Sequence, residues 1–418
     1  MRRTPAIVVS MLATVAVTAS LLIATPAQAA PKPRESLKGT VVQPSLFGMH
    51  VFNVQTGTWP TIPIGSLRLW DNDTSWAQVE KQRGVFDWTT LDGAVATAQA
   101  NGNKDILMVL AGTPAWASDD PKAVALPVAG ASGVPKDMTA WDEWVTAVVT
   151  KYKGRITAYQ PWNEANLSTF WTGTPAQMAD LTKRAYDIIK RIDPAATVVA
   201  PSTGTRLGGP FKKFYPEFLA ELKARNWPVD VWAAHTYPAS LGTPADRAAL
   251  ATSWITMLQA AGAPNLPLWD TENNFGLAGP GAANPDQDII GPQAGEWAAR
   301  AYLDALRLGI SRVYWYAWAP DADLLGIQMN NGSTAAIALK TLQGWIVGAT
   351  FVGCNGTTAV VCRFTRGGVT TRVVWSETGR SSFRVPKKFK QICRLDGRCV
   401  DRGPRKNVRV NGPVLLTP

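Results

Sequence analysis

Residues Ala158–Phe170 read AYQPWNEANLSTF and join an apolar segment to a polar loop. The run Ile156–Trp162 predicts a buried strand, and Asn163 and Glu164 follow it directly. Burying a carboxylate costs free energy, so a glutamate at the mouth of an apolar strand indicates a functional site. A barrel of parallel strands and helices carries its chemistry at this end of its strands.

A second glutamate stands in a similar position farther along the chain. Thr271 and Glu272 follow the apolar, strand-like segment Leu266–Trp269. Because Glu164 and Glu272 are far apart in the sequence, they converge only if the sheet closes, as it does in a barrel. Asp270 is nearby, but the alternation of side chains along a strand points it to the opposite side.

Strand-like and helix-like segments alternate over about 300 residues around these two glutamates. The predicted strands are Leu46–Phe52, Gly65–Trp70, Asp105–Leu110, Ile156–Trp162, Thr197–Ala200, Val229–Ala234, Leu266–Trp269 and Arg312–Trp318. The predicted helices are Leu91–Ala100, Ala140–Tyr152, Pro175–Ile192, Phe211–Asn226, Ala245–Ala261, Pro292–Leu308 and Thr334–Val347. This alternation predicts an α/β protein with a (β/α)8 TIM barrel. A doubly wound open sheet is the alternative, although no glycine-rich phosphate loop follows any strand.

The first 29 residues have the pattern of a signal peptide. Arg2 and Arg3 precede the apolar run Ile7–Ile23, and Ala27-Gln28-Ala29 gives a cleavage pattern. A membrane anchor is the alternative, but the run is barely long enough and no basic stop-transfer cluster follows. We therefore expect a secreted, extracellular protein without a membrane span after signal removal, and the alanine-rich composition indicates a bacterial source.

The chain changes character after about residue 349, where helical spacing stops and short β-rich segments appear. These segments predict a small C-terminal all-β domain. All four cysteines lie there: Cys354, Cys362, Cys393 and Cys399. In a secreted chain we expect two disulfides, with local pairing (354–362 and 393–399) preferred among three connectivities. The predicted organisation is a signal peptide (1–29), a leader (30–45), a barrel (46–348) and a basic β domain (349–418).

Positive charge is concentrated in the C-terminal part of the 418-residue chain. From Arg363 onward there are 14 Lys and Arg against 3 Asp and Glu, whereas Ala30–Cys362 holds 26 basic and 28 acidic residues. The excess predicts docking onto an anionic polymer such as a cell-wall component. A solvated face that aids solubility is the alternative. Nucleic-acid binding is disfavoured in a secreted chain without a recognised motif.

Two motifs resemble those of a known enzyme family. The stretch WNEAN at Trp162–Asn166, with Glu272 at a later strand end, resembles glycoside hydrolase clan A. Together with GTPAWAS at Gly112–Ser118, it is most similar to family 39, which includes β-xylosidases. The resemblance implies a retaining glycoside hydrolase that cleaves O-glycosidic bonds of a plant or bacterial cell-wall polysaccharide, or of its oligosaccharides, by double displacement. Ala165 stands where family 39 more often has proline.

The two glutamates have the residue type that this chemistry needs. Retention requires two carboxylic groups about 5–5.5 Å apart, one protonated and one ionised. Glu164 follows an apolar strand beside Trp162, which favours a raised pKa and the role of acid/base, and leaves Glu272 as the nucleophile. The alternatives are structural carboxylates and a non-catalytic carbohydrate-binding or cell-wall adhesion barrel.

The resemblance also implies roles for residues at other predicted strand ends. It places Asn163 on the sugar hydroxyl next to the reacting carbon, and Arg68 and Tyr237 beside the nucleophile. His50 and His235 each close a strand, and their shared rim favours a place in the site. Two histidines without a convincing third ligand do not make a zinc site, so we expect neither metal nor cofactor.

Three tryptophans are candidates for stacking on sugar faces, where C–H groups meet an aromatic plane. They are Trp116, Trp315 and Trp318. For each of them, a place in the hydrophobic core is the alternative.

Overall fold

The computed structural model describes residues 37–279, 281–282, 284–320, 324–404 and 406–418. The predicted signal peptide (1–29) lies outside the described residues, as does the predicted leader up to residue 36. Within the described ranges, no helix has both the length and the apolar character that crossing a membrane requires.

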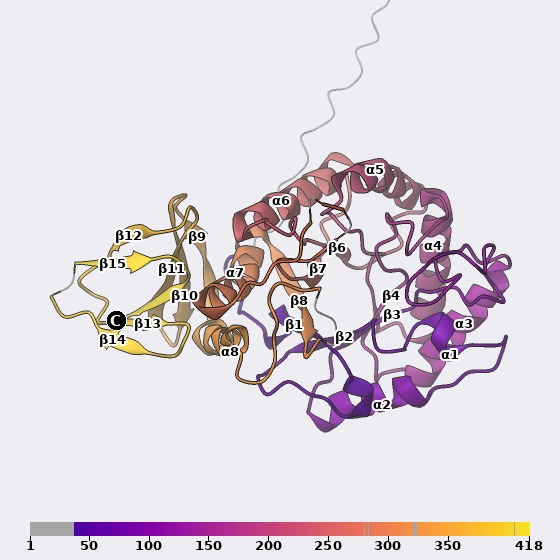
Figure 1. The fold of residues 1–418 in the computed structure, drawn as a ribbon, viewed down its shortest axis with the longest axis horizontal. Coiled ribbons are helices and arrows are strands. Elements are labelled where there is room, and N and C mark those ends of the chain that lie inside the picture. Colours follow the sequence, from indigo (N-terminus) through magenta and orange to yellow (C-terminus); the bar gives the residue numbers. More distant parts are fainter. Residues whose placement is uncertain (1–36, 280, 283, 321–323, 405) are drawn as a thin grey trace, which may run out of the picture. The chain divides into compact units, whose positions relative to one another are not determined.

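Eight parallel strands form the centre of the larger region (Figure 1), with the order β5-β4-β3-β2-β1-β8-β7-β6. They are β1 (Phe47–Val51), β2 (Ser66–Leu69), β3 (Ile106–Val109), β4 (Ala158–Gln160), β5 (Thr197–Val198), β6 (Trp232–His235), β7 (Leu268–Asn273) and β8 (Ile310–Trp318). A parallel bridge between Val199 and Val231 joins the edges beside β5 and β6. The predicted barrel is therefore confirmed.

Helices follow the strands and surround the sheet (Figure 1). They are α1 (Trp76–Val79), α2 (Thr89–Ala100), α3 (Met138–Tyr152), α4 (Pro175–Ile192), α5 (Gly208–Ala224), α6 (Pro244–Ala260), α7 (Gly291–Leu308) and α8 (Thr334–Ile346). Two 3-10 turns, η1 (Pro44–Leu46) and η2 (Val54–Thr56), flank β1. The start of α4 follows from its sequence, because Thr174 and Gln177 form a capping box and proline occupies the first helical position.

The strand β7 differs from the sequence prediction in a way that matters for function. The apolar segment Leu266–Trp269 predicts a strand that ends before Glu272, but β7 continues to Asn273 and is buried throughout. The continuation consists of polar residues whose partners lie on other elements, and hydrophobicity does not detect these partners. Glu272 is therefore part of the strand rather than of a loop after it.

The C-terminal region is antiparallel and all-β, as predicted. One sheet has the order β14-β13-β16-β11-β10-β9, and β12 pairs with β15. The strands are β9 (Thr350–Asn355), β10 (Ala359–Arg366), β11 (Val369–Ser376), β12 (Ser381–Arg384), β13 (Gln391–Arg394), β14 (Cys399–Asp401), β15 (Asn407–Val410) and β16 (Val414–Thr417). Disulfides join Cys354 to Cys362 and Cys393 to Cys399, so the predicted local pairing is confirmed.

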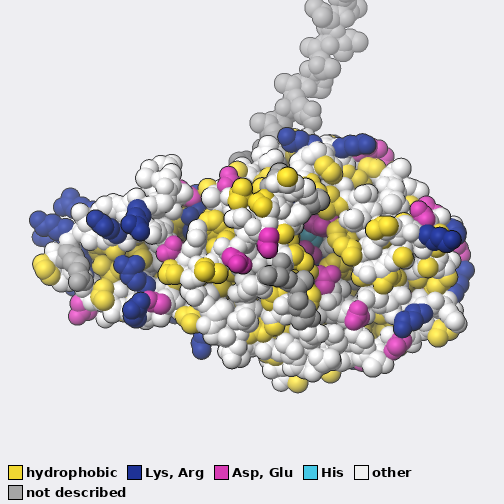
Figure 2. Space-filling view, in the orientation of Figure 1, with side chains coloured by type: hydrophobic (Ala, Val, Ile, Leu, Met, Phe, Trp, Pro, Cys, Tyr) yellow, Lys and Arg dark blue, Asp and Glu magenta, His cyan; other side chains and the backbone are white. Residues whose placement is uncertain are grey.

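Basic side chains gather on the surface of this β region (Figure 2). The exposed ones include Arg380, Arg384, Lys387, Lys388, Lys390, Arg394, Arg398, Lys406 and Arg409. They come from β12, β13, β15 and the loops between them, and they account for most of the positive excess seen in the sequence.

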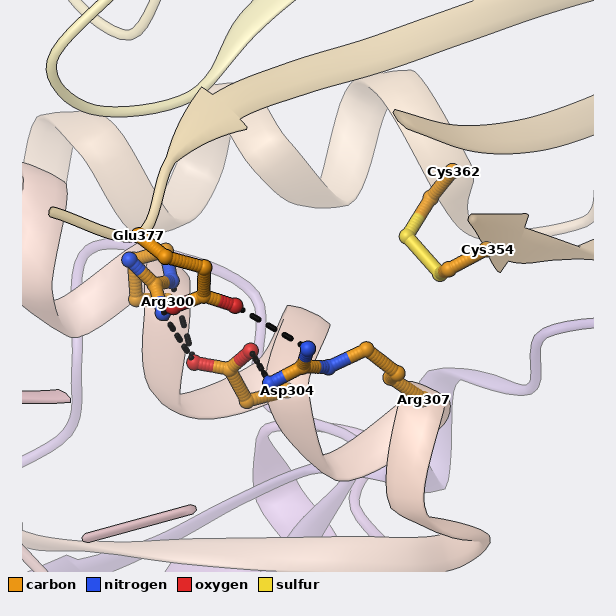
Figure 3. Close-up of a disulfide and its surroundings, with 6 residues drawn as sticks. All are labelled: Arg300, Asp304, Arg307, Cys354, Cys362 and Glu377. Atoms are coloured by element: carbon orange, nitrogen blue, oxygen red, sulfur yellow. Dashed lines mark hydrogen bonds and ion pairs between the residues drawn. A yellow bond between two sulfur atoms is a disulfide. The ribbon is translucent and has the colours of Figure 1, made fainter. Parts of the chain in front are cut away.

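A buried charge network joins the β region to the barrel (Figure 3). Arg300 on α7 lies 2.6 Å from Glu377, which follows β11, and 2.9 Å from Asp304 on its own helix. Arg307 lies 3.0 Å from Glu377 and 3.1 Å from Asp304. The Arg300 guanidinium also lies 5.2 Å from the centre of the Trp375 ring. Each carboxylate thus meets two guanidinium groups, which offsets the cost of burying these charges.

Candidate active site

A cavity of about 1350 Å³ opens at the carboxyl ends of the barrel strands, and both Glu164 and Glu272 line it. Figure 2 shows a hollow in this face, with acidic and histidine side chains visible inside it. Since the two glutamates come from β7 and from the end of β4, barrel closure brings them together across the sheet.

The backbone around Glu164 is held in an unusual conformation. Glu164 has a φ of 38°, in the left-handed region that few residues other than glycine adopt. Its amide donates to the hydroxyl oxygen of Ser202 at 3.0 Å, and the amide of Ala165 donates to the Ser202 carbonyl at 3.0 Å. Ser202 follows β5, so the loops after β4 and β5 are tied together at this point. A strained backbone held by its neighbours is frequent in functional sites.

Gly204 leaves the space in which the Glu164 side chain lies. A Cβ at Gly204 would lie 2.6 Å from Glu164 Oε1. The Asn166 side chain fixes this glycine, because it donates to the Gly204 carbonyl at 3.0 Å and accepts from the Gly204 amide at 2.8 Å. The chain thereby leaves room for one particular position of the Glu164 carboxyl group.

Burial raises the pKa of Glu164 to about 7, an effect that the charges of Arg206 and Arg68 oppose. No cation forms an ion pair with Glu164 among the described residues apart from the histidine contact described below. At neutral pH a substantial share of Glu164 is therefore protonated and can donate a proton.

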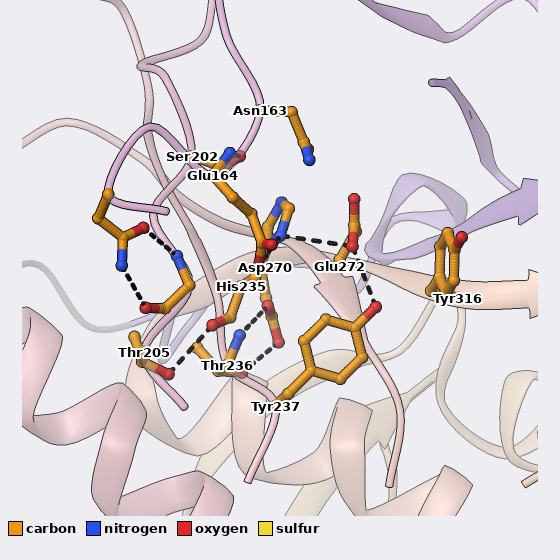
Figure 4. Close-up of polar contacts among 12 residues, drawn as sticks. Asn163, Glu164, Ser202, Thr205, His235, Thr236, Tyr237, Asp270, Glu272 and Tyr316 are labelled. Atoms are coloured by element: carbon orange, nitrogen blue, oxygen red, sulfur yellow. Dashed lines mark hydrogen bonds and ion pairs between the residues drawn. The ribbon is translucent and has the colours of Figure 1, made fainter. Parts of the chain in front are cut away.

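Glu272 has a different set of partners. Arg68 Nη1 donates to its Oε1 at 2.6 Å. The Tyr237 hydroxyl donates to its Oε2 at 3.1 Å (Figure 4). Burial raises the pKa of Glu272, while His235 and Arg68 oppose this rise. Two donors aimed at the carboxylate favour its ionised form.

Arg68 is a fully buried centre of this arrangement. Besides Glu272, its guanidinium donates to Gln160 at 2.9 Å and to Asn163 at 2.8 Å. It also donates to His50 Nε2 at 2.8 Å, so the His50 proton lies on Nδ1. Burial, and next the charge of Arg68, keep the pKa of His50 well below its usual value. The residues that line the cavity do not include His50, which acts on it only through Arg68.

His235 lies between the two glutamates (Figure 4). Its Nδ1 is 3.0 Å from Glu164 Oε1 and 3.4 Å from Glu272 Oε2. Burial lowers the pKa of His235 to about 4, although Glu272 opposes this, so the ring is neutral at pH 7. With its proton on Nδ1 the ring donates to Glu164 when that carboxyl group is ionised, and with Nδ1 unprotonated it accepts from protonated Glu164. One neutral imidazole nitrogen thus faces both carboxyl groups.

A second buried network lies beside the cavity and supports it. Asp270 lies 2.6 Å from Arg247 on α6, and it accepts from the backbone amide of Thr236 at 3.0 Å. Asn273 also donates to Asp270, at 2.8 Å. As predicted from alternation, Asp270 does not line the cavity. Its contacts hold β6 against β7, and so fix the strand ends that carry His235 and Glu272.

Sequence reasoning missed several charged or phenolic residues that line the cavity, among them Asp71, Arg206 and Tyr316. Asp71 follows β2 and accepts a hydrogen bond from the Tyr316 hydroxyl at 2.6 Å. Burial raises the pKa of Asp71 to about 6, although Tyr316 and Arg68 oppose this. Arg206 follows β5 and also lines the cavity. Asp71 directly follows the predicted strand Gly65–Trp70, and Tyr316 lies near the end of the predicted strand Arg312–Trp318. These positions were a signal that could have identified both residues.

The three predicted stacking tryptophans do not line the cavity, which corrects the sequence prediction. Trp116 donates to the Glu80 carbonyl at 2.9 Å and packs on Trp76. Trp315 is fully buried in the core, and Trp318 is almost so. Strand-end position alone did not reveal that these side chains turn into the protein. The aromatic residues that line the cavity are Trp70, Phe170, Trp171, Phe214, Tyr237 and Tyr316.

Within the described ranges, no three His, Cys, Asp or Glu side chains are grouped so as to hold a metal ion. The chemistry that the cavity offers is that of a protonated carboxyl group, an ionised carboxylate and neutral donors between and around them.

Comparison with known proteins identifies the fold. No protein-family model matches the sequence, and no curated protein matches it. Among solved structures, the chain is similar to a family 39 glycoside hydrolase from Bacteroides cellulosilyticus, with a TM-score of 0.64 and 16% identity over 90% of this chain and 82% of that chain. It is also similar to a monomeric β-xylosidase from Caulobacter crescentus, with a TM-score of 0.63 and 18% identity over 93% and 98% of the two chains.

A family 30 endoxylanase from Clostridium papyrosolvens matches with a TM-score of 0.54 and 14% identity, over 92% of this chain and 99% of that chain. At these identities the matches show a shared fold. The predicted resemblance to clan A glycoside hydrolases, and to family 39 most, is therefore confirmed at the level of the fold.

Proposed function

We propose that this protein is a secreted glycoside hydrolase that cleaves O-glycosidic bonds with retention of configuration, by double displacement. The observation that carries this proposal is the pair Glu164 and Glu272, which flank one nitrogen of His235 in the cavity. The shared fold of known glycoside hydrolases adds support from an independent source.

The first step divides the work between the two carboxyl groups. Glu272 attacks the anomeric carbon and forms an ester with the sugar, while the protonated Glu164 donates its proton to the departing glycosidic oxygen. The leaving group departs as an alcohol, and Glu164 becomes a carboxylate. Tyr237 and Arg68 orient Glu272 and stabilise its negative charge before the attack.

The second step reverses these roles. The Glu164 carboxylate takes a proton from a water molecule, whose oxygen attacks the anomeric carbon and releases Glu272. Asn163, which accepts from Arg68 and lines the cavity together with both glutamates, is our candidate for binding the neighbouring sugar hydroxyl.

The spacing of the carboxyl groups supports retention rather than inversion. The distances from His235 Nδ1 to Glu164 and to Glu272 are 3.0 Å and 3.4 Å. Their sum, 6.4 Å, is an upper limit for the separation of these two oxygens, so it leaves room for the about 5–5.5 Å of retaining enzymes and excludes all but the lower edge of the roughly 6.5–9.5 Å of inverting ones.

The test is to follow a hydrolysis reaction by proton NMR and identify the anomer that forms first. Chromogenic aryl glycosides and a panel of plant and bacterial cell-wall polysaccharides, including xylans and glucans, supply the substrates. Retention with loss of turnover in Glu272→Ala supports the proposal. Inversion contradicts the two-step mechanism, and polysaccharide binding without turnover favours the alternative of a non-catalytic carbohydrate-binding or adhesion barrel.

Secretion is part of the same proposal. Two disulfides and the signal-like sequence of residues 1–29 support it, because disulfides persist in oxidising compartments. N-terminal sequencing of protein recovered from the culture medium of the native host tests it. A mature start near Ala30 is expected, whereas an intact N-terminus in the cell pellet would contradict it.

We further propose that the basic surface of the β region binds an anionic cell-wall polymer. The exposed Lys and Arg side chains of β12, β13 and β15 support this (Figure 2). Such binding should weaken with added salt, because ions screen exposed charges. Co-sedimentation with cell walls at low and high salt tests it, with Arg384→Gln/Arg409→Gln compared against the wild type. Equal sedimentation of the two proteins at low salt would contradict it.

A further inference from the structure

The charged residues that line the cavity are unevenly distributed. Asp71 and Asp73 follow β2, whereas both cations of the lining lie on the other side, Arg206 in the loop after β5 and Lys213 on α5. In the sheet, β3 and β4 separate these two groups. The side near β2 carries carboxylates alone, whereas the side near β5 and α5 holds Arg206 and Lys213 together with Glu217.

The cationic side is the side of Glu164. Arg206 is two residues from Gly204, the glycine that makes room for the Glu164 carboxyl group. The charge of Arg206 also acts on the pKa of Glu164 more strongly than the charge of Arg68 does. Because Glu164 protonates the leaving group in the proposed reaction, Arg206 lies where the leaving-group part of the substrate binds.

Arg206 has unused hydrogen-bonding capacity. Its Nη1 donates to the carbonyl of Leu277 at 2.5 Å, which fixes one end of the guanidinium. Among the described residues, no carboxylate forms an ion pair with Arg206 or with Lys213, although both line the cavity. Arg68, by contrast, donates to four partners. A guanidinium has five N–H donors, arranged to receive a carboxylate with two of them.

We propose that Arg206, assisted by Lys213, binds a carboxylate on the leaving-group part of the substrate, as a uronic acid residue would present it. This inference rests on the proposed glycosidase function and adds the chemical class of the leaving group. The half-buried position of Arg206 strengthens such a pair, because partial removal from water makes the charge interaction less screened.

Occupation of this subsite also affects the proton donor. An unpaired cation at Arg206 lowers the pKa of Glu164, and so opposes the protonated form that the first step needs. A carboxylate bound to Arg206 neutralises this effect. Glu164 should therefore stay protonated to higher pH when the leaving group is acidic than when it is neutral.

The experiment compares two aryl glycosides of whichever sugar the wild-type enzyme accepts, one with a 4-carboxyphenyl and one with a 4-carbamoylphenyl leaving group. The measured quantity is the ratio of their kcat/KM values. We expect Arg206→Gln to lower this ratio at least tenfold, mainly through KM, and Arg206→Lys to lower it less, because lysine keeps the charge but not the planar fork. A 4-sulfophenyl glycoside shows whether the site prefers a planar or a tetrahedral anion.

Lys212→Gln is the matched control, since Lys212 is an exposed neighbour of Lys213 on α5 that does not line the cavity. Lys213→Gln should lower the ratio and Lys212→Gln should not. An unchanged ratio in both Arg206 variants overturns the proposal. If the carbamoyl substrate is still hydrolysed in that case, the proposed glycosidase function stands. Failure of the proposed carboxylate site is therefore distinguishable from failure of the proposed glycosidase function.

Discussion

The ends of β4 and β7 present the same side chain in two different surroundings. Glu164 and Glu272 are both buried at the cavity, and burial raises the pKa of each. Glu272 receives hydrogen bonds from Arg68 and Tyr237, whereas Glu164 shares only the neutral His235. Burial thus sets the direction of the shift for both groups, and the number of donors decides which of them can hold a negative charge.

This difference also separates the roles of the supporting residues. A cation in direct contact keeps a nucleophile ionised. A cation held at a distance leaves an acid protonated but still changes its pKa. Arg68 is in direct contact with the Glu272 carboxylate, whereas Arg206 acts on Glu164 from a distance through its charge. The predictions below test whether the two carboxyl groups are as different as their partners indicate.

Removal of each carboxyl group should have the largest effect. Glu272→Ala should lose at least about 10⁴-fold in kcat on all substrates, because the covalent step needs its oxygen. Glu164→Ala should keep most activity on glycosides with an activated leaving group, which needs little protonation. Steady-state rates on an activated and an unactivated glycoside measure the difference.

Azide provides the control for these two variants. In Glu164→Ala it should attack the glycosyl-enzyme and give a glycosyl azide of retained configuration, whereas in Glu272→Ala it should replace the nucleophile and give an inverted product. Product NMR distinguishes the two. The opposite pattern would mean that the roles are exchanged.

Arg68→Met should be the next largest disruption. It leaves Glu272 buried without its cation, which typically costs about 3–5 kcal/mol of stability. The added change Glu272→Gln should recover much of this loss, because it removes the uncompensated charge. Urea unfolding of the single and double variants measures the coupling. Arg83→Met, at an exposed ion pair with Glu143, is the control and should leave the unfolding midpoint unchanged.

The pH dependence of stability should distinguish the two glutamates. The pKa of Glu164 is raised from 4.5 to about 7 in the folded protein, so folding binds a proton between these values. The stability from this group is complete below about pH 4.5 and is lost as the pH rises through 7. Glu164→Gln mimics the protonated form. It should match the wild type at pH 4 and exceed it by up to about 3 kcal/mol at pH 8.

Urea unfolding at both pH values tests this. The contributions of other titrating groups, such as Asp71, to the free energy of unfolding cancel in the comparison because these groups titrate in both proteins. Glu272→Gln should instead be less stable than the wild type, since it leaves Arg68 without its carboxylate. An increase in stability for both variants would show that the surroundings of the two glutamates are equivalent.

The barrel was predictable because its signals are local. Apolar strands alternate with capped amphipathic helices, and the start of α4 follows from Thr174, Pro175 and Gln177 alone. The strand β7 was harder, because its polar end is buried by partners from β2 and α6. The resemblance predicted Arg68 beside Glu272, but nothing in the sequence indicated that Arg247 pairs with Asp270.

The candidate site was predictable to the extent that it depends on strand ends. Glu164, Glu272 and His235 follow from that position, and the two glutamates do converge in the cavity, with His235 in contact with both. The prediction that Trp116, Trp315 and Trp318 stack on the substrate was wrong, because a position near a strand end does not show which way a large side chain points. Arg206 was missed for a related reason, since it lies in a loop whose path depends on tertiary contacts.

The smallest expected effect concerns Gly204. A Cβ there would lie 2.6 Å from Glu164 Oε1, which is the far end of a flexible side chain. Gly204→Ala should therefore displace the carboxyl group rather than the backbone, and the unfolding midpoint should hardly change. We expect kcat on glycosides with poor leaving groups to fall by about tenfold, because general acid catalysis contributes about 10²–10⁴-fold and depends on position.

Gly209→Ala is the matched control, since a Cβ at Gly209, near the start of α5, meets nothing within 4 Å. The control should leave the rates on all substrates unchanged. On activated glycosides, Gly204→Ala should also match the wild type, because these need the nucleophile more than the acid. A similar loss on both kinds of substrate would mean that the added methyl group disturbs Glu272 as well. Such a result would contradict the hypothesis that Glu164 and Glu272, having different partners, can be perturbed separately.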